Sequence, residues 1–222
     1  MKKIMFSDRY GLTEAVLSGR KTMTRRIIKG DYVKIVHLEH EGSFIGKTAN
    51  GDSVILPQPA YNVGEEVAVA QSYSNLREVL AKRNFKRTDA LYDKFYRAMQ
   101  MGETHDGMPG WSNKMFVCAE YMPHRIRITD IKMERLQDIS EEDAMREGIF
   151  KYDKPPLHHE MDLYAPWPPY VKPYKHDNDN LKYRYTARYA FAYLIEKVSG
   201  TGTWNSNPWV FAYTFERTTY NK

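Results

Sequence analysis

The order of short strand-like and helical segments constrains the fold of this 222-residue chain more than any other feature. Apolar alternation predicts six strands, over residues 22–28, 31–37, 66–70, 114–120, 124–133 and 209–216. Helical spacing of apolar residues predicts helices over 12–18, 141–147 and 187–198. The two kinds of segment do not alternate strictly. This order favours an α+β fold built on a small, mostly antiparallel β-barrel flanked by helices.

Two segments interrupt this pattern. Residues 75–110 begin with a polar stretch of helical character and end in a glycine-containing loop, so they predict a helical insertion. Residues 150–182 are rich in Pro, Tyr and His and lack periodicity, which predicts a long loop. With both segments treated as insertions, residues 1–222 are predicted to form a single domain.

Positive charge is concentrated at the start of the chain. Residues 1–34 carry nine Lys or Arg and three acids, a local net charge of +6, whereas the whole chain carries +5. A basic first segment on a nearly neutral remainder indicates a local anionic partner such as phosphate or nucleic acid. The alternative is a solvated charged face without a ligand.

The single cysteine, Cys118, rules out an internal disulfide and suits a reducing compartment. It lies in an apolar run, which predicts a buried, inert thiol rather than a nucleophile. The first residues lack the apolar region of a secretory signal, and no stretch approaches the roughly 18 to 20 apolar residues that span a bilayer. We therefore expect a cytoplasmic location and no membrane partner.

Four motifs resemble the ASCH domain family of the PUA-like superfamily. Residues 16–26 (VLSGRKTMTRR) resemble its opening helix-to-strand motif, and 61–69 (YNVGEEVAV) resemble a strand motif of the family. Residues 126–149 are similar to its central strand and following helix, and 207–211 (NPWVF) to its closing strand. The resemblance implies a PUA-like barrel. It also implies RNA binding, as in some relatives, or removal of the acetyl group from N4-acetylcytidine, as in small bacterial amidohydrolases.

The resemblance also implies three catalytic residues: Lys21, Thr24 and Glu147. Thr24 is then the nucleophile, Lys21 its base and Glu147 the acid that protonates the leaving amine. As a base, Lys21 must be neutral, so its pKa must fall from about 10.4 by about 3 units. Neighbouring arginines lower it, and burial must supply the rest.

Strand alternation bears on this hypothesis. A strict alternation places Lys21 and Thr24 on opposite faces of the strand. The site therefore requires Lys21 to precede the regular strand, which Gly19 permits. The alternative interpretation assigns these residues no catalytic role. Lys21 is then a solvated lysine, Thr24 a strand threonine and Glu147 a surface glutamate at a helix end.

A second hypothesis is a nucleic-acid-binding module without chemistry. In that case the phosphates are contacted by Arg20, Lys21, Arg25 and Arg26. Exposed aromatic side chains would stack on unpaired bases; the candidates are Trp111, Tyr121, Trp167 and Tyr170.

Two further residues are pocket candidates. Long relatives in the ASCH family carry Arg-Glu followed by Thr-Trp where this chain has Ala70-Gln71-Ser72-Tyr73. If that glutamate takes part in the site of those relatives, its replacement by Gln71 leaves the site of this chain without that acid. Gln71 and Tyr73 are therefore predicted to line the pocket.

A third hypothesis is a protein-interaction module, because residues 151–180 contain polyproline-like segments. The adjacent His158 and His159 do not have the spacing of a helical zinc site, so no metal is predicted. The sequence contains no phosphate-binding glycine loop and no dinucleotide fingerprint, so no cofactor is predicted either.

Overall fold

The computed structural model describes residues 1–38, 43–76, 110–152, 162–168 and 184–218. The predicted insertions at 75–110 and 150–182 lie mostly outside these residues, so they stay predictions, as does the single domain.

The chain forms two compact units. Unit 1 comprises Met1–Phe6, Glu66–Arg127 and Arg217–Lys222, and unit 2 comprises Ser7–Glu65 and Ile128–Glu216. Each unit therefore combines segments that are distant in the sequence.

The largest sheet has five strands in the order β1-β6-β7-β10-β2. β1 pairs with β6 in parallel, whereas the β6–β7 and β10–β2 pairs are antiparallel. The predicted α+β class with a largely antiparallel sheet is confirmed. Among the described strands, however, the sheet ends at β1 and β2 and does not close into a barrel. The bounds are β1 (Lys3–Ile4), β2 (Met23–Ile27), β6 (Glu66–Val69), β7 (Arg125–Arg135) and β10 (Trp209–Thr218).

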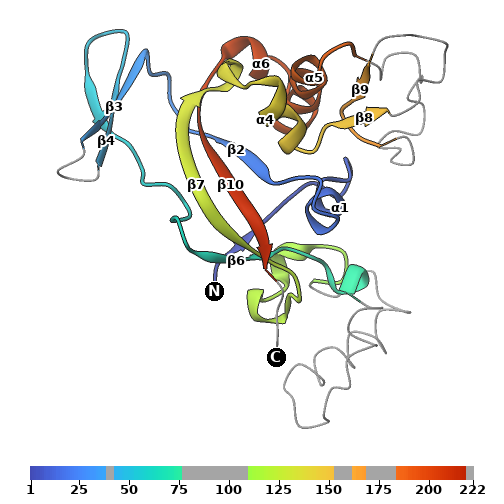
Figure 1. Cartoon of the computed structure of the whole chain (residues 1–222). Helices are drawn as coiled ribbons and strands as arrows, with labels where there is room; N and C mark the ends of the chain where they lie inside the picture. Colours follow the sequence, from blue (N-terminus) through green and yellow to red (C-terminus); the bar gives the residue numbers. More distant parts are fainter. Residues whose placement is uncertain (39–42, 77–109, 153–161, 169–183, 219–222) are drawn as a thin grey trace. The chain divides into compact units, whose positions relative to one another are not determined.

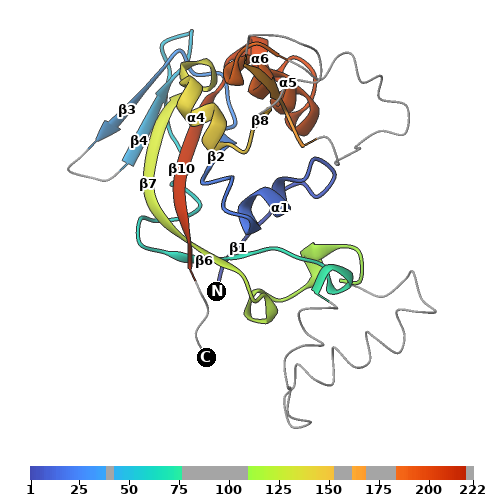
Figure 2. The same ribbon diagram turned by 45° about the vertical axis from the view of Figure 1, so that its right-hand side comes forward.

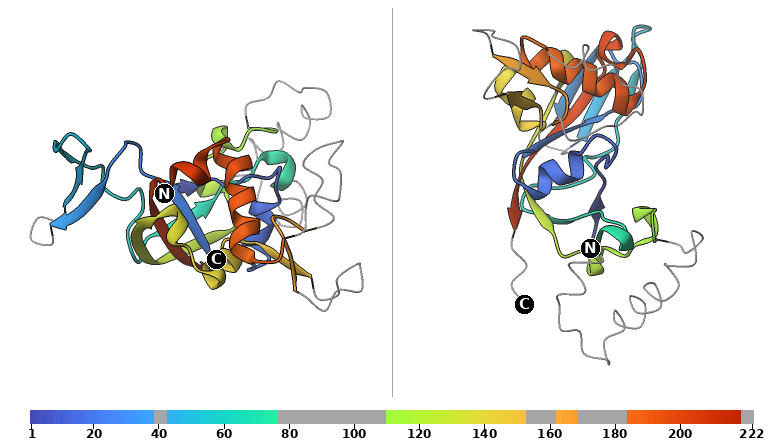
Figure 3. Two further views of the ribbon diagram at one scale, coloured as in Figure 1. Left: turned by 90° about the horizontal axis from the view of Figure 1, so that it is seen from above. Right: turned by 90° about the vertical axis from the view of Figure 1, so that its right-hand side faces the viewer.

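Two smaller sheets belong to unit 2. β3 (Lys34–Leu38), β4 (Ser43–Lys47) and β5 (Ser53–Ile55) form an antiparallel meander that extends to one side of β10, in blue to cyan in Figure 3. β8 (Phe150–Tyr152) pairs with β9 (Leu163–Ala165). The meander was predicted as one strand followed by hairpin turns.

Three helices of unit 2 gather near the same ends of β7 and β10, as Figures 1 and 2 show from two directions. They are α4 (Glu141–Arg146), α5 (Ala187–Ser199) and α6 (Thr203–Ser206). α1 (Leu12–Leu17) precedes β2, and η3 (Leu136–Asp138) follows β7. The three helices predicted from sequence are thus confirmed as α1, α4 and α5. In the part of the chain that the structure describes, no helix is long and apolar enough to cross a membrane.

The capping residues explain where α4 and α5 begin. Ser140 accepts a hydrogen bond from the Asp143 amide, and Thr186 accepts one from the Tyr189 amide. Such caps satisfy backbone donors that lack a partner within the helix. In β10 the aromatic residues at odd positions share one face, as the alternation predicted.

The strand predicted over residues 114–120 in unit 1 is wrong. This segment forms two short helices, η1 (Lys114–Phe116) and η2 (Ala119–Tyr121). The Lys3 ammonium explains the irregular backbone, because it binds the carbonyl oxygens of residues 114, 115 and 117 at 3.3, 2.5 and 2.9 Å. Consecutive carbonyls of a strand point in opposite directions, so carbonyls 114 and 115 of a strand could not both reach one ammonium. Cys118 is exposed, which also corrects the expectation of a buried thiol.

Candidate functional site

Lys21 lies at the junction between α1 and β2. Gly19 adopts a positive φ of 84°, and the Lys21 amide donates to the carbonyl of Ala15 at 2.8 Å. β2 begins only at Met23, so Lys21 precedes the regular strand, as the site requires. Its side chain is only 2% exposed, and its ammonium contacts Glu147 twice: the carboxylate Oε2 at 2.5 Å and the backbone carbonyl at 2.7 Å.

Glu147 occupies the C-cap position of α4 and is 4% exposed. Gly148 follows it with φ of 98°, a conformation that L side chains rarely adopt. A β-carbon at Gly148 would lie 3.2 Å from the Lys21 β-carbon and 3.4 Å from that of Ala15. Glycine therefore ends the helix and lets this chain segment approach Lys21 closely.

Arg25 holds three carboxylates together beside this pair. Its side chain is 1% exposed. Its Nη2 lies 2.6 Å from Glu134 Oε1 and 3.2 Å from Asp143 Oδ2, and its Nη1 lies 3.2 Å from Glu147 Oε1. Glu147 thus bridges Lys21 and Arg25 through its two oxygens. A buried cluster with this many charge-assisted hydrogen bonds fixes the position of each member.

Glu134 and Asp143 were not predicted as site residues. A signal for Asp143 was present, because it precedes Glu147 by four residues on the same helix and therefore shares its face. Ala144, between them, is fully buried, which places this side of α4 against the rest of unit 2. No such sequence signal identifies Glu134, because its contact with Arg25 joins two strands that are distant in sequence.

The surroundings of Lys21 lower its pKa. Burial lowers the pKa of Lys21 below its ordinary value of 10.5. Its contact with Glu147 raises the pKa, and the positive charges of Arg26 and Arg25 lower it again. Burial is the largest of these effects, so the net pKa is lowered. This is the direction that a base requires.

Thr24 lies on β2, is 5% exposed and pairs with Tyr213 of β10. Within the described residues, no side chain hydrogen-bonds to Thr24, so its hydroxyl is not joined to Lys21 or Glu147. Alternation places Arg26 on the same face of β2 as Thr24. The positive charge of Arg26 lowers the pKa of Lys21 more than that of Arg25 does. A cation on the same face as Thr24 therefore acts on the Lys21 ammonium.

Aromatic side chains line the neighbourhood of Thr24. The ring of Tyr61 meets that of Tyr213 edge-to-face, with centroids 5.4 Å apart. The Tyr213 hydroxyl accepts a hydrogen bond from the Ala60 amide at 2.9 Å. Burial raises the pKa of both tyrosines, and Arg26 partly offsets this. Tyr61 remains partly exposed, so an aromatic surface and a cation lie near the strand that carries Thr24.

The three arginines predicted to bind phosphate have different surroundings. Arg25 is buried and paired with carboxylates, so its guanidinium does not face solvent. Arg20 binds the Gly148 carbonyl and, at 3.1 Å, Glu14. Arg26 is half-buried and acts on Lys21 and on the tyrosines near Thr24. Because Arg25 is buried, its guanidinium is not placed to contact a phosphate, in contrast to the prediction.

The two pocket candidates belong to unit 1, whereas Lys21, Thr24 and Glu147 belong to unit 2. Gln71 is 4% exposed, and its Oε1 has no hydrogen-bond partner among the described residues. Tyr73 is buried in an apolar cluster with residues that include Leu76 and Met122.

The predicted stacking residues differ in accessibility. Trp167 is 1% exposed, with its ring centroid 5.4 Å from that of Tyr10, so it is a core residue and not a stacking surface. Trp111 is half-buried against the apolar cluster of unit 1. The Tyr121 side chain and Tyr170 lie outside the part that the structure describes, as do His158, His159 and most of residues 151–180.

Comparison of the chain with protein-family models, curated proteins and solved structures gives no match in any of the three. The function is therefore inferred from the residues of the site.

Proposed function

We propose that this protein is an ASCH-like protein that binds a modified nucleoside and hydrolyses the amide of an N4-acylated cytidine. The observation that carries the proposal is the buried contact of 2.5 Å between the Lys21 ammonium and Glu147. Lys21, the predicted base, lies at the α1–β2 junction, and Glu147, the predicted acid, lies at the end of α4. Each is less than a tenth exposed, and their side chains are in contact.

The Lys21–Glu147 pair suits acid-base chemistry because its two members can exchange one proton. Moving the proton from Nζ to the carboxylate gives a neutral amine and a neutral acid with the same total charge. Burial penalises the charged members of such a pair, and it lowers the pKa of Lys21. The neutral form then has a base for the nucleophile and an acid for the leaving group.

Thr24 is the nucleophile in this mechanism. Its hydroxyl oxygen attacks the acyl carbon while its proton passes to Lys21. Glu147 gives a proton to the exocyclic nitrogen as the C–N bond breaks, so cytidine leaves and the acyl group remains on Thr24 as an ester. Water then attacks the ester. One water proton returns to the threonine oxygen, the carboxylic acid is released, and the pair regains its starting protons.

Arg25 positions Glu147 in this proposal. It binds the oxygen that does not contact Lys21, so the carboxylate has one oxygen for each cation. The PUA-like barrel is part of the same proposal. It is supported by the largely antiparallel sheet and by the α1–β2 junction, which has the order of the opening ASCH motif.

The proposal is tested by incubating the full chain with N4-acetylcytidine and following cytidine release by chromatography. Wild type is expected to release cytidine. Thr24→Val, which replaces the hydroxyl with a methyl group of similar size, is expected to reduce the rate at least about 100-fold, because the nucleophile is lost. Thr22→Val is the matched control, because Thr22 lies in the same segment and has no assigned role.

Absence of cytidine release by wild type at high protein concentration would remove the hydrolase proposal. Equal rates for wild type and Thr24→Val would remove the assigned nucleophile. Circular dichroism of each variant separates loss of chemistry from loss of folding.

A further inference from the structure

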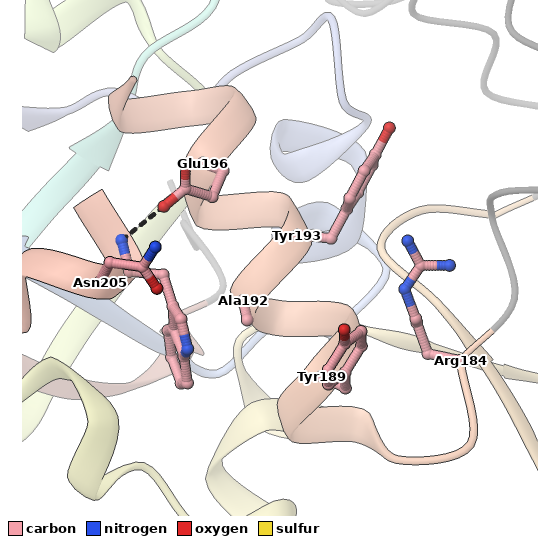
Figure 4. A pocket seen from close by; sticks show the side chains of 7 residues that line it. Arg184, Tyr189, Ala192, Tyr193, Glu196 and Asn205 are labelled. Carbon is pink, nitrogen blue, oxygen red and sulfur yellow. Dashed lines mark hydrogen bonds between the residues drawn. The ribbon is translucent and has the colours of Figure 1, made fainter. Parts of the chain in front are cut away.

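A hollow of about 410 Å³ lies along the outer face of α5 in unit 2. It is lined by side chains that include Arg184, Tyr189, Tyr193 and Trp204, and Figure 4 shows Arg184 beside the helix that carries both tyrosines. A second hollow of about 440 Å³ shares Tyr189 and Trp204 and adds Arg188. The two hollows are therefore adjacent, and together we call them the α5 surface.

Cations and aromatic rings interleave on the α5 surface. The Arg184 Cζ atom lies 5.0 Å from the Tyr193 ring centroid and 5.6 Å from that of Tyr189. The Arg188 Cζ atom lies 5.6 Å from the Trp204 ring. Guanidinium groups at these distances are attracted to aromatic faces and are held near them. Tyr189 is nonetheless 64% exposed, so an aromatic ring remains accessible to solvent.

Helical spacing accounts for this arrangement. Tyr189, Tyr193 and Lys197 follow at intervals of four residues and therefore share one stripe of α5. Another stripe, which includes Phe191 and Leu194, is buried. The apolar stripe anchors the helix. In the tyrosine stripe, the Tyr193 ring lies 6.0 Å from the core ring of Trp167, whereas Tyr189 is exposed.

The carboxylates near the α5 surface are engaged by backbone donors. Glu196 accepts hydrogen bonds from the amides of Gly202 and Trp204, both at 2.6 Å. Glu141 accepts from the amides of Ala187 and Arg188, at 2.7 and 3.1 Å. Both acids are therefore oriented toward backbone amides, whereas the guanidinium groups of Arg184 and Arg188 lie over the rings.

We propose that the α5 surface binds a single-stranded nucleic acid, with bases stacking on Tyr189 and Trp204 and phosphates near Arg184 and Arg188. Accessible rings beside cations are the combination that unpaired bases and a phosphate backbone require. The proposal does not rest on hydrolysis at Lys21, because none of these residues belongs to that site. It also places base stacking at residues other than those predicted from sequence.

The test is fluorescence anisotropy of the full chain with a labelled oligouridine about 12 nucleotides long. An oligothymidine of equal length is the second probe and distinguishes RNA from DNA as the ligand. Tyr189→Ala is expected to weaken binding about 5- to 100-fold, because stacking on one ring is lost. Phe116→Ala is the matched control: Phe116 is 63% exposed, like Tyr189, but belongs to unit 1.

The salt dependence separates stacking from phosphate contact. Arg188→Gln is expected to reduce the slope of log affinity against log salt by about 0.7, the value for one phosphate contact on a single strand. Tyr189→Ala is expected to leave that slope unchanged. Arg127→Gln serves as the charge control, because Arg127 is an exposed arginine of unit 1.

Three results would overturn the proposal. One is absence of binding to both probes at low salt. A second is equal weakening by Tyr189→Ala and Phe116→Ala, which would mean that binding does not use the α5 surface. Self-association that Tyr189→Ala abolishes, without oligonucleotide binding, would also overturn it and identify a protein interface, in which Tyr and Arg are common. Hydrolysis of free N4-acetylcytidine, measured in parallel, is independent of all three results.

Discussion

Two regions of unit 2 use arginine in opposite ways. Arg25 is buried and surrounded by carboxylates, whereas Arg184 and Arg188 lie over aromatic rings that line surface hollows. One helix connects the two regions. The Phe191 ring, on the buried side of α5, lies 5.9 Å from the Arg25 Cζ atom, and Tyr189 on the same helix is exposed.

The difference shows that burial decides what a cation can do. The buried guanidinium of Arg25 is committed to internal carboxylates and serves to position them. Arg188 of the α5 surface is exposed, so a ligand can reach its charge. The buried cluster is accordingly the candidate for chemistry and the α5 surface the candidate for binding.

The largest expected effect comes from removing the buried arginine. Arg25→Met keeps an unbranched side chain but leaves Glu134, Asp143 and Glu147 without their common partner. Breaking a buried charge network in this way costs about 3–5 kcal/mol of unfolding free energy. Urea denaturation measures the loss.

The control is Arg127→Met, because Arg127 pairs with Glu66 at 3.2 Å where both side chains are more than a third exposed. Its expected cost is at most about 1 kcal/mol. Similar losses for the two variants would contradict the contrast between buried and exposed cations.

Glu147→Gln has an intermediate expected effect. The substitution keeps the shape of the side chain but removes the charge that faces Lys21 and Arg25, at a cost of about 2 kcal/mol. Because Glu147 raises the pKa of Lys21, the variant should lower that pKa further, and it should lose hydrolysis at least about 100-fold. Glu142→Gln, on the exposed side of α4, should leave stability and hydrolysis unchanged. Full hydrolysis by Glu147→Gln would mean that the buried pair is structural.

The smallest expected effect on stability belongs to the α5 surface. Tyr189→Ala removes an exposed ring, so the free energy of unfolding should change by no more than about 0.5 kcal/mol. The helix itself is held by the buried side chains on its other face. A loss of several kcal/mol would show that Tyr189 packs as a core residue and would remove the contrast between the two regions.

Local pattern predicted much of the fold. α1, α4 and α5, β2 and β10 follow from apolar spacing and from a capping serine, all of which act within a few residues. The strand prediction for residues 114–120 was wrong, because backbone carbonyls of this segment bind Lys3, more than 100 residues away. Apolar content alone does not reveal such a partner.

The candidate site was predicted in part. Lys21 and Glu147 do meet, but the pairing of Arg25 with Glu134 and Asp143 was not foreseen. Which charged side chains meet across two strands depends on how the strands are aligned with each other. The alternation of apolar and polar residues does not specify that alignment. The α5 surface was missed for a different reason. Apolar spacing identified the helix, and its polar stripe, with Tyr and Arg, was not considered as a site.

The central claim is that burial makes Lys21 a base, and titration of its amine tests this most directly. Nitrogen-15 labelling of the lysines, with Lys21→Met to assign the signal, lets NMR follow the Lys21 Nζ as pH rises. The account predicts that Lys21 loses its proton below pH 10.5, the ordinary value for lysine. Loss of the proton at 10.5 or above would contradict it, because Lys21 would then be a fixed cation that pairs with Glu147 and cannot accept a proton from Thr24.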